Sequence, residues 1–188
     1  IYVPPNACGC FNQVKLQGLL AMSSRHNHIP EKTGDGKLEK GPAYAQLTNQ
    51  AAQPVNPQSW PMYRHDSERS GVASTQLAAK PMVAWTTDVG GELTQPVADA
   101  ERVYVAATQR HSVHALDAGS GKKVWTYIAG GRVDSAPTLW QGRLLFGCAD
   151  GWVYCLRARD GALAWRFRAA PSERLITVFG QLENSWPV

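Results

Sequence analysis

The sequence predicts an all-β chain built from repeated four-stranded antiparallel sheets. Three observations predict it: tryptophans recur at a fixed interval, the segments between them alternate apolar and polar residues in twos, and turn-forming residues separate those segments. Trp85, Trp125 and Trp165 lie 40 residues apart. Helical repeats would instead place apolar residues at i, i+3, i+4 and i+7, so a helical repeat of this length is excluded.

The repeat extends well beyond the tryptophans. "HSVHALDAGSGKKVW" (111–125) aligns without gaps on "GWVYCLRARDGALAW" (151–165). "QPVADAERVYVAAT" (95–108) lies over "APTLWQGRLLFGCA" (136–149) at an offset of 41. A third copy begins where "SWPV" (185–188) repeats an earlier "SAPT".

Each unit is predicted to hold four short strands, because β-branched and aromatic residues alternate with polar ones and Gly or Asp marks the junctions. The expected strands are 94–98, 102–107, 112–116 and 122–128 in the first unit, and 135–139, 143–148, 152–156 and 162–168 in the second. Four antiparallel strands in about 40 residues are typical of a β-propeller blade.

The turn before each tryptophan has a specific chemistry. The Asp117 side chain can accept hydrogen bonds from backbone N–H groups of the turn, and Gly121 supplies the positive φ needed to enter the fourth strand. Gly161 repeats this role in the second unit. A tryptophan at the rim of a fourth strand must bury a large surface and satisfy its N–H, so Trp85, Trp125 and Trp165 are expected to be wedges between neighbouring blades.

The number of blades in a closed propeller shows how much of a ring this chain can form. Propellers close with typically about 4 to 8 blades, whereas this chain is expected to hold about two full blades plus portions of two others. An unclosed arc exposes apolar faces. We therefore expect a partial ring, a fragment of a larger multidomain protein whose remaining blades come from the parent chain or from other chains.

The organisation along the chain follows from the same pattern. Residues 59–188 are predicted to be the partial propeller, with blades at about 94–128 and 135–168 and the next blade starting at 185. Residues 1–24 are expected to be the strand-like tail of a preceding module. Residues 25–58, rich in Pro, Gly, Asn, Gln and Lys, are expected to be a linker or a surface strap.

Composition excludes several classes of function. The formal net charge of +4 comes from scattered basic residues, which argues against a nucleic-acid partner. No stretch approaches the roughly 20 apolar residues of a membrane span, and no signal-peptide pattern is present.

The four cysteines indicate no redox motif. Cys8 and Cys10 are weak candidates for metal ligands, with a plain loop or a disulfide as alternatives. Cys148 and Cys155 flank a turn in a register that keeps their sulfurs too far apart to bond, so both are expected to be small buried apolar residues.

A family resemblance rests on the turn motif. "ALDAGSGKKVW" (115–125) resembles the tryptophan-docking motif of the PQQ-type β-propeller repeat, found in quinoprotein dehydrogenases and in the outer-membrane assembly lipoprotein of the BamB type. "CLRARDGALAW" (155–165) is a second copy with Arg157 where the family favours Asp, and "WPMYRHDSERSG" (60–71) is similar to the lead-in of such domains. The resemblance implies the fold and an exported location: periplasmic, cell-surface or secreted.

Two functions follow from the resemblance. The first is a non-catalytic scaffold or protein-interaction segment in the bacterial envelope, since no catalytic motif is present and the long connection after Trp165, "PSERLITVFGQLE", is expected to project as a binding loop. The second is part of a dehydrogenase that uses PQQ and calcium to oxidise alcohols or sugars. Asp134 and Glu183 are the candidates for oxygen ligands on the propeller axis, where the resemblance places PQQ and calcium; the alternative for each is a solvated carboxylate at the rim. The family often has an adjacent cysteine pair that packs on the quinone, and this sequence has none.

A third function stays open at this stage, a module that binds carbohydrate or peptide through exposed aromatic residues. Trp140 and Trp152 are its candidates, and a structural role is the alternative for each.

Overall fold

The computed structural model describes residues 2–3, 20–21, 37–47, 56, 58–76, 78–178 and 180–188. The chain divides into two compact units, Ile1–Thr33 and Gly34–Val188. In the first unit, β1 (Tyr2–Val3) pairs antiparallel with β2 (Leu20–Ala21). The predicted linker or strap at 25–58 and the tail at 1–24 lie largely outside the described residues.

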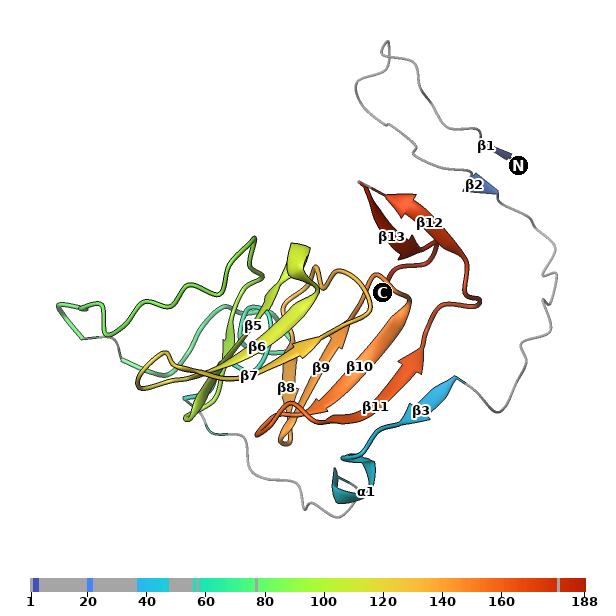
Figure 1. Cartoon of the computed structure of the whole chain (residues 1–188). Coiled ribbons are helices and arrows are strands. Elements are labelled where there is room, and N and C mark those ends of the chain that lie inside the picture. Colours follow the sequence, from blue (N-terminus) through green and yellow to red (C-terminus); the bar gives the residue numbers. More distant parts are fainter. Residues whose placement is uncertain are drawn as a thin grey trace, which may run out of the picture. The chain divides into compact units, whose positions relative to one another are not determined.

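The second unit contains two antiparallel sheets of the predicted kind (Figure 1). In the first sheet the order is β4 (Val97–Ala98), β5 (Arg102–Ala107), β6 (Ser112–Asp117) and β7 (Lys123–Ile128). In the second it is β8 (Thr138–Trp140), β9 (Arg143–Gly147), β10 (Trp152–Arg157) and β11 (Leu163–Arg168), with β3 (Leu38–Lys40) as a fifth strand on β11. We call β4–β7 blade 1 and β8–β11 blade 2.

The two blades repeat even in their irregularities. Ala115 pairs with Trp125 in blade 1, and Cys155 pairs with Trp165 in blade 2. In both blades the register shifts directly after this pair, before Leu116 and before Leu156. The predicted all-β fold of four-stranded antiparallel blades is therefore confirmed.

An aromatic core holds the two blades face to face. Tyr127 of blade 1 lies with its ring centroid 6.3 Å from Phe146 and 5.8 Å from Tyr154 of blade 2, and Phe146 and Tyr154 are stacked at 5.2 Å. Buried aliphatic residues of both sheets fill the same cluster, among them Val113 and Leu144. Aromatic pairs of this geometry contribute roughly 1 kcal/mol each beyond their buried area.

Two tryptophans dock on the turn of the following blade. The Trp85 indole N–H donates to the carbonyl oxygen of Ala118, and the Trp125 indole N–H donates to that of Ala158, each over 2.9 Å. The ring of Trp125 packs against Gly161, where an added Cβ would be 2.7 Å from the indole. Gly161 also has a φ of +72°, so neither its conformation nor its surroundings accept a side chain.

A strap crosses the outer edge of blade 2. β3 pairs antiparallel with β11, and the following turn of helix, α1 (Tyr44–Leu47), continues from it. The Gly41 N–H donates to the carbonyl of Ala164 over 2.7 Å. The sequence did not predict a strand here, because β3 has no apolar alternation and its pairing partner lies more than a hundred residues away.

The long connection after β11 forms a hairpin of its own. β12 (Leu175–Val178) pairs with β13 (Gln181–Asn184). Residues 185–188 form no strand in the structure, so a blade starting at 185 stays a prediction. The remaining helical element, η1 (Thr108–Arg110), is a single 3₁₀ turn between β5 and β6.

Loss of a docked tryptophan should weaken the blade interface. We expect Trp125→Ala to lower the free energy of unfolding by about 3 kcal/mol, because removing this partly buried indole and its hydrogen bond leaves a cavity between the sheets. The control is Trp140→Ala, since Trp140 is 52% exposed and lies beneath the Arg143 guanidinium; its loss should stay below about 1 kcal/mol. Equal losses in urea denaturation would show that Trp125 is no wedge.

A buried histidine should make stability depend on pH. His114 lies between two hydroxyls, with Ser112 Oγ 2.9 Å from Nε2 and Thr126 Oγ1 3.0 Å from Nδ1. Burial lowers the pKa of His114 below its ordinary 6.5. The unfolded chain therefore binds a proton that the native chain resists, and the free energy of unfolding should fall as pH drops below 6.5. Urea titrations at several pH values should show a flatter dependence for His114→Gln; an unchanged slope would contradict this.

Candidate functional site

Four connections gather at one end of the two blades. Strands of an antiparallel sheet alternate in direction, so the loops after β5, β7, β9 and β11 all emerge at the same end. Backbone hydrogen bonds join these loops. The Ala149 N–H donates to the carbonyl oxygen of Arg132, and the Asn184 N–H donates to the carbonyl oxygen of Ala149. We call this end, with the β12–β13 hairpin, the loop end.

An arginine pairs with both of the axis candidates. Arg132 donates from Nε to Glu183 Oε1, and its terminal nitrogen lies 3.4 Å from Asp134 Oδ2. Glu183 is only 3% exposed, whereas Asp134 is half exposed. A solvated rim carboxylate is therefore the wrong description of Glu183. The hydrogen bond to Glu183 raises the pKa of the Arg132 guanidinium.

Sequence reasoning missed Arg132. Glu183 lies 51 residues away on the hairpin, so no local spacing connects the two. The available signal was the Arg132–Asp134 pair, since residues two apart on an extended chain share a face.

The hairpin is anchored through one face, and the other face carries two exposed leucines. On the inner face, Gln181 bridges to blade 1: its Oε1 lies 2.9 Å from His111 Nε2, and its amide nitrogen donates to Gln109 over 2.7 Å. The opposite face carries Leu175, 62% exposed, and Leu182, 65% exposed. Both faces are mixed, since Ile176 and Val178 share the face of Gln181, and Thr177 and the buried Asn184 share the face of Leu182.

The base of the hairpin is fixed by a buried amide. Asn184 donates through its side chain to the carbonyl of Ser172 over 3.0 Å and accepts from the Trp186 N–H, also at 3.0 Å. Both polar ends of this buried side chain are therefore satisfied. These polar contacts fix the position of the hairpin relative to the blades.

The residues present here do not fit the calcium and PQQ of the quinoprotein dehydrogenases. Ca²⁺ needs six to eight oxygen ligands, yet both carboxylates are paired with Arg132. Within the described residues, His, Cys, Asp and Glu form no group of three or more that could hold a metal ion. Cys8 and Cys10, the other metal candidates, lie outside the described residues.

The two described cysteines are buried and unpaired. Cys148 and Cys155 are free, as the register of the β9–β10 hairpin predicts. Burial raises the pKa of both thiols, that of Cys155 to about 11. Since the thiolate is the reactive form, neither thiol is suited to nucleophilic chemistry at neutral pH.

The exposed aromatic residues do not form a ligand platform. Trp152 is only 7% exposed and lies beneath Arg166 and Arg168, whose guanidinium carbons are 4.2 and 5.7 Å from the ring centroid. The expectation that Trp152 presents an exposed face is wrong, because its strand faces the core. Trp140 alone of this pair is exposed.

The turn residues have structural contacts. Asp117 Oδ1 accepts from the backbone N–H of Ser120 over 2.8 Å. Hydrogen bonding by the Ser120 side chain lowers the pKa of Asp117. In blade 2, Arg157 occupies the Asp117 position and donates to Asp160, so an ion pair closes the same turn with a different chemistry.

None of the described helices is both long enough and apolar enough to cross a membrane.

Comparisons with known proteins agree on the repeat. The family model described as outer membrane protein assembly factor BamB matches residues 67–182. The chain is 30% identical over 115 residues to the dehydrogenase subunit of a quinone alcohol dehydrogenase of Gluconobacter oxydans, and 27% identical over 105 residues to the assembly factor BamB of Escherichia coli. These matches cover 53% and 48% of this chain but only 15% and 27% of the relatives' lengths.

Solved structures show the same fold. A quinohemoprotein alcohol dehydrogenase from Comamonas testosteroni matches 68% of this chain with a TM-score of 0.50 and 23% identity, over 22% of its own length. A quinohemoprotein alcohol dehydrogenase from Pseudomonas putida HK5 matches 77% of this chain with a TM-score of 0.53 and 18% identity, over 24% of its own length. At these identities the likeness concerns the fold alone.

The Arg132–Glu183 pair should hold the hairpin in place. Arg132→Met leaves a buried carboxylate unpaired, which typically costs about 3 kcal/mol. We expect hydrogen exchange of the β12–β13 amides to accelerate by roughly 100-fold while the amides of β5 and β6 keep their protection. The double variant Arg132→Met/Glu183→Met should recover much of the protection, because no charge is then left buried; failure to recover would assign the hairpin's order to other contacts.

Proposed function

The chain belongs to the family described as outer membrane protein assembly factor BamB, and from this premise we propose that it is a non-catalytic β-propeller segment acting as a scaffold or protein-interaction element in the bacterial envelope. The supporting observation is the anchored hairpin at the loop end, which leaves Leu175 and Leu182 exposed. A projection that is fixed by polar contacts and that presents apolar side chains to solvent is suited to binding.

The partner we propose is a protein with an apolar surface. Leu175 and Leu182 lie on the same face of the hairpin, with Leu182 directly opposite Thr177, and both leucines are exposed. Anchoring by Gln181 and Glu183 holds this face in one orientation before binding. A preorganised surface loses less conformational freedom when a partner docks, which supports affinity.

The chemistry of the loop end supports a scaffold over an enzyme. Its two axis carboxylates are paired with a guanidinium, and its thiols are buried. We propose that it has no catalytic residue within the described part of the chain. An exported location, periplasmic, cell-surface or secreted, belongs to the same proposal.

The alternative is part of a PQQ- and calcium-dependent quinoprotein dehydrogenase that oxidises alcohols or sugars. The relative from Gluconobacter oxydans supports it, because that protein is named as the dehydrogenase subunit of a quinone alcohol dehydrogenase. Since the match covers 15% of that relative, a cofactor site of the whole protein would lie in other blades.

Two measurements on the complete parent protein separate these functions. A photoreactive amino acid at Leu182 should give a discrete protein adduct in the producing bacterium, whereas the same group at Lys122, exposed in the β6–β7 turn at the opposite end of the sheet, should give none. Leu175→Asp should abolish the adduct. Calorimetric titration with PQQ and Ca²⁺ should show no binding.

The opposite results would defeat the scaffold proposal. Stoichiometric PQQ and Ca²⁺ binding with dye reduction dependent on an alcohol or sugar would assign the protein to the dehydrogenases. Equal adducts at Leu182 and Lys122 would remove the hairpin as a binding surface.

A further inference from the structure

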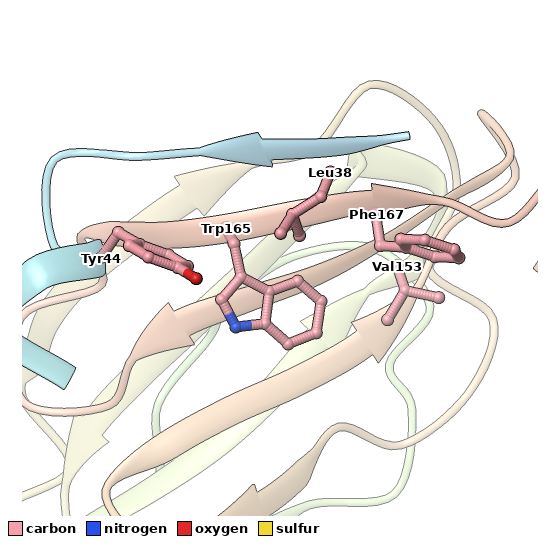
Figure 2. Close-up of a pocket in the computed structure, with 5 residues that line it drawn as sticks. All are labelled: Leu38, Tyr44, Val153, Trp165 and Phe167. Atoms are coloured by element: carbon pink, nitrogen blue, oxygen red, sulfur yellow. The ribbon is translucent and has the colours of Figure 1, made fainter. Parts of the chain in front are cut away.

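The strap demonstrates that an outer strand of this protein can receive an added strand. β3 pairs antiparallel with β11, so that Glu39 lies opposite Arg166, and the two side chains form an ion pair of 2.6 Å. The strap also makes apolar contacts, because Leu38 of β3 and Tyr44 of α1 line an apolar groove beside Trp165 (Figure 2). Strand addition takes its affinity from backbone hydrogen bonds and its specificity from alternate side chains.

β7 is the counterpart of β11 in blade 1, 40 residues earlier in the sequence. Among the described residues it is the last strand of its sheet. The Ala129 N–H donates to the carbonyl of His111, so the odd-numbered amides of β7 turn toward β6 and those of Thr126 and Ile128 turn outward. The same outward position in blade 2 is that of Arg168, whose N–H donates to the strap over 2.7 Å.

The open edge of β7 lacks the usual protection of an edge strand. Natural edges are blunted by charged side chains, by proline or by a covering segment. β11 has two of these devices, since it carries Arg166 and Arg168 and is covered by the strap. From Val124 to Ile128, β7 has no charged residue and no proline, and no described strand covers it. Such an edge is suited to receive a strand from elsewhere.

The side chains of β7 match a different strand from the strap. Thr126 occupies the position that Arg166 has in β11, and Ile128 occupies that of Arg168. Glu39 of the strap would therefore have no cation to pair with on β7. Cross-strand pairs of β-branched and hydroxyl residues are favourable, so the matching segment carries uncharged β-branched residues at these positions.

We propose that the outer edge of β7 binds an extended, uncharged segment of another protein, rich in β-branched residues, which adds to blade 1 as a fifth strand in the way that β3 adds to blade 2. The contact uses backbone groups of β7 and no residue of the β12–β13 hairpin. The inference is therefore independent of the role proposed for the hairpin, and either can fail without the other.

The test uses a synthetic peptide based on the strap. Residues 36–45 read "GKLEKGPAYA", and the probe carries the changes Lys37→Val and Glu39→Thr, which place β-branched side chains opposite Ile128 and Thr126. In the ¹⁵N-labelled 188-residue chain with the probe in excess, we expect hydrogen exchange of these two β7 amides to slow by about 10-fold or more. The odd-numbered amides of β7, which turn toward β6, should not change.

Two changes to the peptide separate strand addition from general adhesion. The unaltered strap sequence, with Glu39 opposite Thr126, should bind about 10-fold more weakly than the probe, because its carboxylate loses solvation without gaining a cation. N-methylation of Gly41 in the probe removes the donor that on β11 bonds to the Ala164 carbonyl over 2.7 Å. This peptide should give no protection, and protection equal to that of the probe would show that no strand is added.

Two variants of the chain test the edge itself. Thr126→Arg restores the cation that Glu39 binds on β11, so this variant should prefer the unaltered strap peptide to the probe. Ile128→Pro removes one outward N–H at an edge, where proline is tolerated, and should weaken binding of the probe by about 10-fold. Both variants should keep the amide protection of β5, which reports that blade 1 is folded.

Three results would overturn the proposal. The first is unchanged exchange at Thr126 and Ile128 in the presence of the probe. The second is protection of the β12–β13 amides in their place, which would assign the probe to the hairpin. The third is protection of β7 that grows with the concentration of the chain when no probe is present, because the edge would then belong to a second copy of this chain.

Discussion

The docking of an indole onto a glycine turn is the contact on which the arrangement of this protein depends. A four-stranded sheet cannot bury both of its faces alone, so each blade needs a neighbour at a fixed distance. Trp125 sets that distance by filling the space against Gly161 and donating to Ala158. A larger residue than glycine would move the turn away, and a smaller residue than tryptophan would leave a cavity.

The loop end uses polar contacts where the blade interface uses packing. Arg132 holds Glu183, and Gln181 bridges to His111 and Gln109. These bonds anchor the hairpin through Gln181 and Glu183 and leave Leu175 and Leu182 exposed. The same bonds remove the two carboxylates from cofactor binding, because a carboxylate already paired with a guanidinium is a poor ligand for a hard cation. One arrangement therefore both supports a binding projection and argues against a quinone site within these blades.

The strap relates two surfaces that are distant in sequence. Residues 37–47 pair with the outer strand of blade 2 and cover Cys155 through Ala43. Strand addition of this kind satisfies the unpaired edge of β11, which would otherwise be open to non-specific pairing. Leu38 and Tyr44 of the strap also line the apolar groove beside Trp165. The same short segment therefore covers both the edge of blade 2 and part of its adjoining face.

The amino-acid sequence by itself determined the blades. The 40-residue spacing of Trp85, Trp125 and Trp165, the period-two alternation and the glycine turns are local signals, and local signals define strands and hairpins. Three features appear only in the tertiary structure: the pairing of β3 with β11, the buried ion pair of Glu183 with Arg132, and the burial of Trp152. Each of these joins residues far apart in sequence, or depends on which face of a strand the neighbouring sheet covers, and no spacing along one chain specifies that.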